Sequence, residues 1–461
     1  MESFDVVVLG GGPGGYAAAL YGAAAGLRVA LIEEHRVGGT CLHRGCVPAK
    51  ELLQTAEVLR TVSNAKEFGV DIGPQPVLDL TASQTRKQQV VDRLTRGLER
   101  LLSNRTVTVV PGTGTLVDAR SHHVRVSDGS ELQGNALILA TGSLPRSLPG
   151  LDFDGERVVH SDHVLTLTEV PGRVLIVGAG AVGCEFASLL SDLGSEVTLL
   201  EALPRILPGV DVEVAEVVAR SFRKRGVNLH TGVRVAGVDG ERELTVSYDS
   251  PAGAQQVVVD KVVVSIGRRP RSEGINLERS GIEVDSRGFI SVDPLMRTSI
   301  PGIYAVGDVV DTPQLAHVGF AEAIVAIKTI LGEGATPVDY EKVPWGIYSH
   351  PEVAFSGLTE LRARELGHDV VTTVHRFGGN SRALIIGEPE GLMKVVAARE
   401  GPILGVHAAG PWATELLQEG YLAVNWQATP AEVAALIHPH PTLSELFGES
   451  ALALAGRSLH S

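Results

Sequence analysis

Cysteine is scarce in this chain, with three among 461 residues. So few cysteines cannot form the disulfide framework of a secreted domain. Basic residues are in the minority too, because 40 Lys and Arg against 54 Asp and Glu leave a formal charge of −14, which argues against nucleic acid as the main partner. No apolar run approaches the ~18 residues that cross a bilayer, and the opening Met-Glu-Ser-Phe-Asp has no basic leader. These absences predict a cytoplasmic protein, and the chain length predicts several domains.

Two of the three cysteines, Cys41 and Cys46, lie in one glycine-rich turn that leads into a predicted helix. A disulfide between them would close a very small loop and would therefore stabilise the fold little. A pair that opens and closes easily suits redox chemistry, and a helix N-terminus can lower the pKa of a thiol. Two buried, inert cysteines are the alternative interpretation of this stretch.

The amino-terminal residues carry the pattern of a dinucleotide-binding turn. A β-branched run over 4–9 predicts a strand, the glycines Gly10, Gly12 and Gly15 follow, and an Ala-rich pattern over 16–25 predicts a helix. Glycines at this spacing allow a tight turn and a close approach to a pyrophosphate at the helix N-terminus. A second strand over 29–32 ends at Glu33, whose carboxylate can accept hydrogen bonds from a ribose.

The same pattern occurs again in the middle of the chain. A strand over 173–177, the glycines Gly178, Gly180 and Gly183, a helix over 184–193 and a strand over 196–200 precede Glu201. Each glutamate follows the first glycine of its own turn by 23 residues. Two such turns predict two dinucleotide sites, one for a flavin and one for a nicotinamide cofactor. Ala202 after Glu201 offers no cation for a 2′-phosphate, so the sequence favours NADH over NADPH, although Arg205 is near.

The remaining segments suggest further elements. The patterns predict an amphipathic helix over 86–104, a β-meander over 107–132, a strand over 137–142, a strand over 298–308 that ends in Gly307-Asp308, strand-like runs over 348–354 and 391–398, and helices over 413–425 and 430–437. The carboxylate of Asp308 can bind a sugar-like hydroxyl or cap a turn. The predicted domains are 1–149 and 150–275 for the two dinucleotides, a central segment 276–342, and an α+β unit over 343–461.

The last motif is His438-Pro439-His440-Pro441-Thr442-Leu443-Ser444-Glu445. If the turn brings His440 and Glu445 together, the histidine becomes a base oriented by a carboxylate. Two surface histidines in a proline-rich loop are the alternative. The histidines lack further partners for a metal, and no metal site is predicted.

Taken together, these motifs resemble the pyridine nucleotide-disulfide oxidoreductase family, and within it the members that oxidise dihydrolipoamide. The resemblance extends over essentially the whole chain. It implies two Rossmann-like dinucleotide-binding domains with FAD and NAD, and a carboxy-terminal α+β dimerisation domain. It also implies a homodimer that serves lipoyl domains and the acyltransferase core of a 2-oxoacid dehydrogenase complex, or a lipoyl carrier protein.

The resemblance also implies roles for single residues. Cys41 would exchange with the lipoyl dithiol and Cys46 would face the flavin, with Lys50 near flavin N5 and Glu185 paired with Lys50. His440, preceding a cis peptide bond to Pro441, would be the base for the other subunit's disulfide, oriented by Glu445. The implied cofactor contacts are Gly10, Gly12, Gly15, Glu33, Thr40, Lys50, Thr141, Gly142, Asp308 and Ala316 for FAD, and Gly178, Gly180, Gly183, Glu201 and Gly267 for NAD.

Two alternatives stay open at this point. One is an NAD(P)H-dependent reductase of another small disulfide or of a quinone, and the other is a docking subunit of a multienzyme complex. Three residues depart from the family pattern: His43 and Arg44 stand where Asn and Val are often found, and Pro439 stands where Ala is usual.

Overall fold

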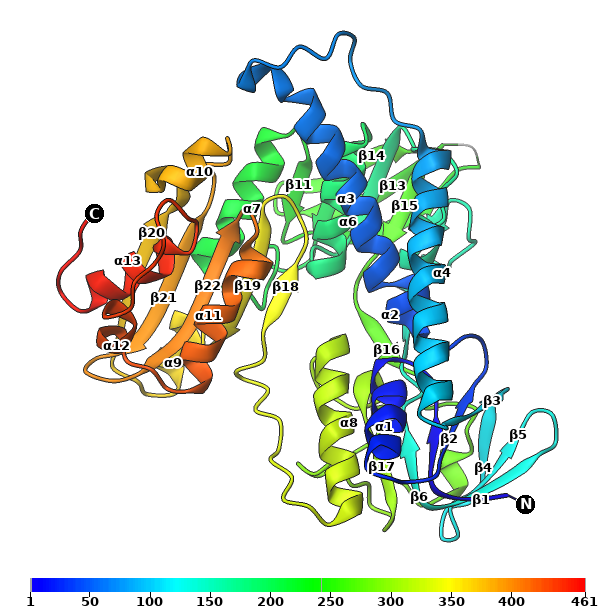
Figure 1. The fold of residues 1–461 in the computed structure, drawn as a ribbon. Coiled ribbons are helices and arrows are strands. Elements are labelled where there is room, and N and C mark those ends of the chain that lie inside the picture. Colours follow the sequence, from blue (N-terminus) through cyan, green and yellow to red (C-terminus); the bar gives the residue numbers. More distant parts are fainter. Residues whose placement is uncertain (1, 242, 461) are drawn as a thin grey trace. The chain divides into compact units, whose positions relative to one another are not determined.

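The computed structural model describes residues 2–241 and 243–460, which form two compact units (Figure 1). The first unit contains the chain up to Leu52, Thr81–Arg146 and Gly267–Tyr340. The second unit contains Leu53–Leu80, Ser147–Ile266 and the chain from Glu341 on. The four domains expected from the sequence stay a prediction.

The sheet of the first unit is buried on both faces. Its strands are, in spatial order, β3 (Thr108–Pro111), β2 (Val29–Glu33), β1 (Glu2–Leu9), β6 (Glu131–Leu139), β5 (His123–Val126) and β4 (Gly114–Asp118), with β17 (Ile303–Ala305) also paired to β6. Side chains alternate along β1, so Val6 and Val8 face the helices while Val7 and Leu9 pack against the β4–β5 meander. Strands β1, β2, β3, β6 and β17 are parallel to one another.

Small residues allow two helices to pack closely on this sheet. Helix α1 (Pro13–Ala24) lies beside α8 (Ala316–Leu331) (Figure 1), and Ala18 and Ala19 of α1 share one core with Ala323 and Ala326 of α8. The carboxyl ends of β1, β2 and β6 meet at the edge of the sheet where α1 begins, which is where parallel sheets bind ligands.

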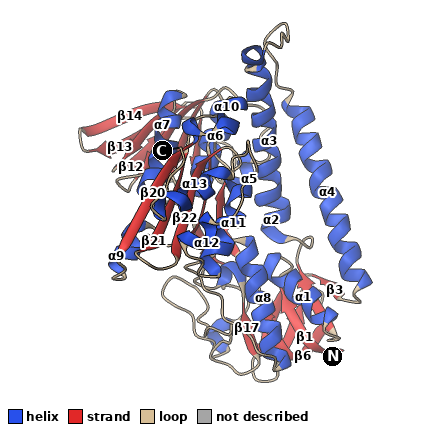
Figure 2. Cartoon of the chain, turned by 60° about the vertical axis from the view of Figure 1, so that its left-hand side comes forward, coloured by secondary structure: helices blue, strands red, loops and turns tan. Residues whose placement is uncertain are grey.

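The second unit contains three sheets. A parallel sheet has the order β11 (Asn228–Thr231), β10 (Glu196–Glu201), β9 (Arg173–Val177), β15 (Lys261–Val264), β8 (Val158–Val159). An antiparallel sheet joins β12 (Arg234–Asp239), β13 (Leu244–Ser250) and β14 (Gly253–Val259), and another joins β18 (Trp345–Ile347), β19 (Glu352–Gly357), β22 (Ile403–Gly410), β21 (Leu392–Ala398) and β20 (Val370–Arg376). Helices α11 (Ala413–Asn425), α12 (Pro430–Ala434) and α13 (Glu445–Leu454) share one core with this last sheet (Figure 2).

The remaining elements are short strands, helices and 3₁₀ turns. They are β7 (Ser143–Pro145) paired with β16 (Arg268–Pro270); α2 (Gly39–Arg44), α3 (Cys46–Ser63), α4 (Leu80–Asn104), α5 (Ser161–Val164), α6 (Ala181–Asp192), α7 (Val212–Lys224), α9 (Glu360–Glu365) and α10 (Ser381–Ile385); and η1 (Ala65–Phe68), η2 (Leu277–Arg279), η3 (Gly307–Val309) and η4 (Phe377–Gly379). Within residues 2–241 and 243–460, no helix has the length and apolarity needed to cross a membrane.

The predicted fold class is confirmed, and several element boundaries are wrong. The strand predicted over 298–308 is limited to β17, and Asp308 lies in η3. The strand predicted over 348–354 is instead the connection between β18 and the start of β19, because Pro351 has no N–H for a strand ladder. The helix predicted over 430–437 ends at Ala434, and the amphipathic helix over 86–104 begins earlier, at Leu80. The strand over 173–177 and the helix over 413–425 are confirmed to the residue.

Candidate active site

The cysteine segment packs directly on the first dinucleotide turn. Gly38 donates its N–H to the carbonyl of Gly11 at 2.7 Å, and a Cβ on Gly39 would lie 2.5 Å from Cα of Gly12. Gly39 also has a φ of 57°, so a side chain is excluded there on two grounds. The expected turn around the cysteines is wrong in one respect, because Cys41 lies inside helix α2 and Cys46 is the first residue of helix α3.

The two thiols of this segment contact each other. The side chains of Cys41 and Cys46 share a hydrogen bond, and this bond together with burial raises the pKa of the Cys41 thiol. Lys50, one turn further along α3, acts in the opposite direction through its charge. The lowered thiol pKa expected at a helix N-terminus is therefore not found at Cys41.

Tyr16 is a neighbour of the cysteines that the sequence analysis missed. Burial, followed by the charges of Cys41 and Cys46, raises its pKa to about 12, so its hydroxyl stays protonated. The ring packs against Phe320 of α8 with 5.6 Å between centroids. The sequence feature that could have identified Tyr16 as a site residue is its position directly after Gly15, near the start of a helix whose N-terminus faces the site.

The first dinucleotide turn has the geometry that its glycines predict. Gly10 has a φ of 101°, and a Cβ there would lie 2.2 Å from the carbonyl oxygen of Ala140. A Cβ on Gly15 would lie 1.8 Å from the carbonyl oxygen of Gly10. Glu33 accepts the N–H of Gly11 at 2.6 Å and of His35 at 2.9 Å, one on each oxygen.

A cavity beside Glu33 fits the adenosine end of FAD. Its volume is about 430 Å³. Its lining is Glu33, His35, Arg36, Val37, Glu99, Ser103, Thr106, Val107, Val109 and Pro111. A carboxylate beside a partly apolar cavity can hold a ribose and cover an adenine.

Asp308 is held in place by two residues that the sequence analysis did not select. Its carboxylate accepts the hydroxyl of Ser143 at 2.5 Å, and Arg268 donates Nε to the same hydroxyl oxygen at 2.6 Å. A backbone hydrogen bond also holds the turn that carries Asp308, because buried Glu322 accepts the N–H of Gly307 at 2.6 Å. Burial raises the pKa of Glu322 despite its hydrogen bonds.

Four further predicted FAD residues lie in the same unit. Thr141 donates its hydroxyl to the carbonyl of Arg271 at 2.6 Å, and Gly142 has a φ of 77°. Ala316 is the first residue of α8, and Thr40 lies in the first turn of α2. The first unit therefore brings together Gly10, Gly12, Gly15, Glu33, Thr40, Lys50, Thr141, Gly142, Asp308 and Ala316.

The second dinucleotide turn repeats this geometry in the second unit. A Cβ on Gly183 would lie 1.9 Å from the carbonyl oxygen of Gly178. Buried Glu201 accepts the N–H of Ala179 at 2.7 Å and of Leu203 at 2.8 Å. Gly178, Gly180, Gly183 and Glu201 all belong to the second unit, whereas Gly267 falls at the start of a first-unit segment.

Arg205 is occupied by backbone carbonyls. Its guanidinium donates to the carbonyl oxygens of Val210 at 3.0 Å and Pro208 at 2.9 Å. These bonds use the guanidinium within its own loop, which leaves Glu201 as the charged group at the end of β10. The arrangement favours a ribose diol over a 2′-phosphate.

Glu185 is buried on α6 and bound by a loop of its own unit. Its carboxylate accepts the N–H of Tyr348 at 2.9 Å, and the hydroxyl of Ser188, one turn on, accepts the N–H of His350 at 2.9 Å. Lys50 belongs to the other unit, so its pairing with Glu185 stays a prediction.

His350 gives the stability of this unit a pH dependence. Burial, followed by the charges of Arg60 and Arg225, lowers its pKa to about 3. Between about pH 3 and 6.5, His350 binds a proton in the unfolded chain but not in the folded chain. The free energy of unfolding therefore falls as the pH falls, by at most about 1.4 kcal/mol per pH unit.

We expect the melting temperature of His350→Asn to depend less steeply on pH than that of the wild type between pH 4.5 and 7. Exposed His368 supplies the control, because His368→Asn should follow the wild-type curve; parallel curves for His350→Asn would contradict the assignment.

The terminal motif forms the expected histidine–carboxylate pair. Nδ1 of His440 lies 2.9 Å from Glu445, whose other oxygen accepts the N–H of Thr442 at 2.7 Å. Although burial opposes it, these bonds lower the pKa of Glu445, so the carboxylate is charged near neutral pH. The peptide bond from His440 to Pro441 is cis, as predicted. The side chain of His440 is 69% exposed, so its Nε2 edge is open to a second molecule.

The other histidine of the motif belongs to a separate pair. Nε2 of His438 lies 2.8 Å from Glu419 of α11, and its side chain is only 12% exposed. A Cβ on Gly448 would lie 2.4 Å from the ring, so this glycine makes room for it. His438 is packed into the fold, whereas His440 is presented outward.

Comparisons with known proteins agree over the whole chain. Residues 4–323 match the family model described as pyridine nucleotide-disulphide oxidoreductase, and residues 343–451 match the dimerisation domain of the same family. A dihydrolipoyl dehydrogenase of Bacillus subtilis is 41% identical, with 99% of each chain covered, and one of Thermus scotoductus is 41% identical over 100% of this chain and 99% of its own. Among solved structures, LpdA from Mycobacterium tuberculosis has a TM-score of 0.91 at 28% identity, covering 98% of this chain and 100% of its own. The HOCl-induced flavoprotein disulfide reductase RclA from Escherichia coli has a TM-score of 0.86 at 27% identity, covering 98% and 99%.

Proposed function

Because the chain belongs to the pyridine nucleotide-disulphide oxidoreductase family, we propose that it oxidises protein-bound dihydrolipoamide to lipoamide and reduces NAD⁺ to NADH. It is an FAD-dependent oxidoreductase that uses NAD(H). The observation that carries the substrate proposal is the hydrogen-bonded pair Cys41 and Cys46 beside the first dinucleotide turn. A dithiol substrate can exchange with such a pair without any other group changing its oxidation state.

The exchange follows from thiol chemistry. A thiolate of the substrate attacks the sulfur of Cys41 in the oxidised pair, the bond between the two cysteines breaks, and Cys46 leaves as a thiolate. The second substrate thiol then attacks the mixed disulfide, which releases lipoamide and returns Cys41 as a thiol. Two electrons pass from substrate to the cysteines, and His440 accepts a substrate proton. FAD held at the first dinucleotide turn would supply the two-electron chemistry that links the cysteine pair to NAD⁺.

The raised pKa of Cys41 agrees with this division of roles. In the reduced pair the hydrogen bond to Cys46, together with burial, favours the protonated form of Cys41. Lys50 lies close enough to act on the pair through its charge. We assign Cys41 to the substrate and Cys46 with Lys50 to the flavin, and Glu185 to the support of Lys50.

The base is proposed to act in a homodimer. The dimerisation domain over 343–451 supports association of two copies, and the exposed edge of His440 suits a base that works on the cysteines of the partner subunit. The further partners we propose are lipoyl domains and the acyltransferase core of a 2-oxoacid dehydrogenase complex, or a lipoyl carrier protein, in the cytoplasm.

Steady-state kinetics with a substrate panel test this function. Purified yellow protein is assayed with NADH and with NADPH against lipoamide, glutathione disulfide and a quinone. We expect kcat/KM for lipoamide with NADH to exceed every other combination by about 100-fold, because Glu201 suits a ribose diol and the cysteine pair suits a dithiol. A higher value for glutathione disulfide or the quinone would replace the proposed substrate, and no turnover at all would make docking the main role.

A further inference from the structure

Arg271 contacts two of the turns that surround the proposed FAD site. Its N–H donates to the carbonyl of Gly142 at 2.9 Å, and its carbonyl accepts the hydroxyl of Thr141 at 2.6 Å. Strand β16, which ends one residue earlier, pairs with β7 so that Pro270 lies opposite Ser143. The backbone of Arg271 is therefore fixed against the turn at the carboxyl end of β6.

The side chain of Arg271 reaches the end of a different strand. Its guanidinium forms a two-pronged ion pair with Glu34, in which Nη2 lies 2.7 Å from Oε2 and Nη1 contacts Oε1. Glu34 directly follows Glu33, and the charge of Glu33 also acts on Arg271. The Glu34 side chain is 18% exposed and that of Arg271 is 39% exposed, so water screens the pair only in part.

Each partner of the pair favours the charged form of the other. The hydrogen bond from Arg271 lowers the pKa of Glu34, and the hydrogen bond to Glu34 raises the pKa of Arg271. A planar bidentate pair of arginine and carboxylate restricts the orientation of the two side chains as well as the distance between them. Arg271 is thus bonded on one side to the turn of Thr141 and Gly142, and on the other to the residue beside Glu33.

We propose that the ion pair between Arg271 and Glu34 is a clasp that slows the release of FAD. The inference rests on the placement of FAD in the first unit. The clasp ties the Glu33 turn to the Thr141–Gly142 turn, and a cofactor held between these turns leaves only when they separate. Arg271 and Glu34 are positioning residues in this proposal, because they act through the turns that bear the cofactor contacts.

The rate of FAD release tests the clasp. Holoprotein variants Arg271→Ala, Glu34→Gln and the double variant are diluted, and the rise of flavin fluorescence is followed. We expect each single variant to release FAD about tenfold faster than the wild type, as for a partly buried bidentate ion pair. The double variant should be no faster than the single ones, since both substitutions remove the same interaction. Added salt should accelerate the wild type and leave the variants unchanged.

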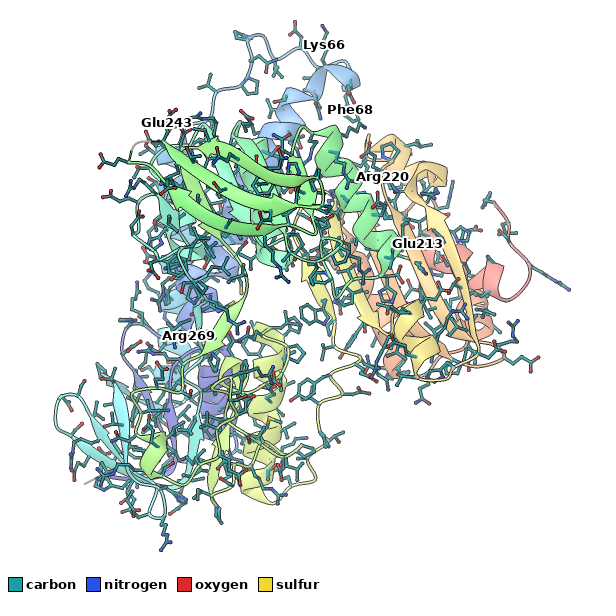
Figure 3. The ribbon with its side chains drawn as sticks, turned by 180° about the vertical axis from the view of Figure 1, so that it is seen from behind. Lys66, Phe68, Glu213, Arg220, Glu243 and Arg269 are labelled. Carbon is teal, nitrogen blue, oxygen red and sulfur yellow. The ribbon has the colours of Figure 1, made fainter. Side chains whose placement is uncertain are left out.

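Arg269 provides a matched control two residues away. It lies on β16 (Figure 3) and pairs with Glu273 at 3.3 Å in an exposed position. Arg269→Ala removes a guanidinium, as Arg271→Ala does, and should release FAD at the wild-type rate. The melting temperatures of all the apoproteins should be equal, while those of the Arg271→Ala and Glu34→Gln holoproteins fall.

Three outcomes would overturn the clasp. The first is an FAD release rate for Arg271→Ala that equals that of Arg269→Ala. The second is a double variant whose increase in release rate equals the product of the increases in the two single variants. The third is a melting temperature that falls as far in the apoprotein of a variant as in its holoprotein. The proposed function fails separately, since it requires turnover of lipoamide by holoprotein and the clasp concerns FAD retention alone.

Discussion

Cys41→Ser abolishes NADH-dependent reduction of lipoamide and leaves FAD bound. The variant loses the sulfur proposed to form the mixed disulfide, so we expect the rate to fall by at least about 10³-fold. Cofactor binding should survive because the contacts of the FAD turn, including the N–H of Gly38 on Gly11, come from backbone groups. Stopped-flow mixing with NADH and lipoamide measures the rate, and the visible spectrum measures bound flavin. Lipoamide turnover at the wild-type rate would contradict the mechanism.

Cys46→Ser fails in a different way. In partly reduced enzyme, the thiolate of Cys46 beside the flavin should give a long-wavelength absorption band, which Cys41→Ser retains and Cys46→Ser loses. We expect this asymmetry because Cys46 is the thiol assigned to the flavin and Cys41 is the thiol assigned to the substrate. Cys184→Ala is the matched control, because this third cysteine is fully buried and bonded to the carbonyl of Ala179; it should retain the band. The band disappearing in Cys41→Ser alone would reverse the two roles.

Local sequence patterns were sufficient to predict the two dinucleotide turns. The spacing of Gly10, Gly12 and Gly15 has a steric reason that acts within one turn, as the 1.8 Å approach of a Cβ on Gly15 to Gly10 demonstrates. The pairing of His440 with Glu445 is also local, since five residues and one turn separate them. Patterns of this kind are visible in the sequence because their physical cause lies within a few residues.

Contacts between distant segments were not predictable in the same way. Ser143 and Asp308 lie 165 residues apart and Arg271 and Glu34 lie 237 apart, and neither pair leaves a periodic signal. The family resemblance implied roles for residues of the motifs, and it implied none for Ser143, Arg271 or Glu34. The strand predicted over 348–354 was wrong for a local reason, the missing N–H of Pro351, although the loop found there is also held by long-range bonds from its N–H groups to Glu185 and Ser188. Tertiary packing decided the contacts between distant segments.

We expect His440→Gln to lower the turnover of dihydrolipoamide by about 10²- to 10⁴-fold, the range for removal of a positioned base. Glutamine retains a hydrogen-bonding side chain of similar length but cannot accept the substrate proton. Glu445→Gln should have a smaller effect, about 10- to 100-fold, because the base stays and loses the carboxylate 2.9 Å from its Nδ1. Initial rates between pH 6 and 9 measure both.

The pH dependence separates the role of the carboxylate from a general loss of structure. The pKa of Glu445 is lowered, so its carboxylate is charged over the whole range and the Glu445→Gln defect should be constant from pH 6 to 9. The pair of His438 and Glu419, with a 2.8 Å contact in the same terminal region, offers the matched control. Glu419→Gln removes an equivalent charge from a histidine that is packed inward, and it should turn over within about threefold of the wild type. Equal losses in Glu419→Gln and Glu445→Gln would mean that the motif serves the fold of the terminal segment, because only His440 presents an open edge to a substrate proton.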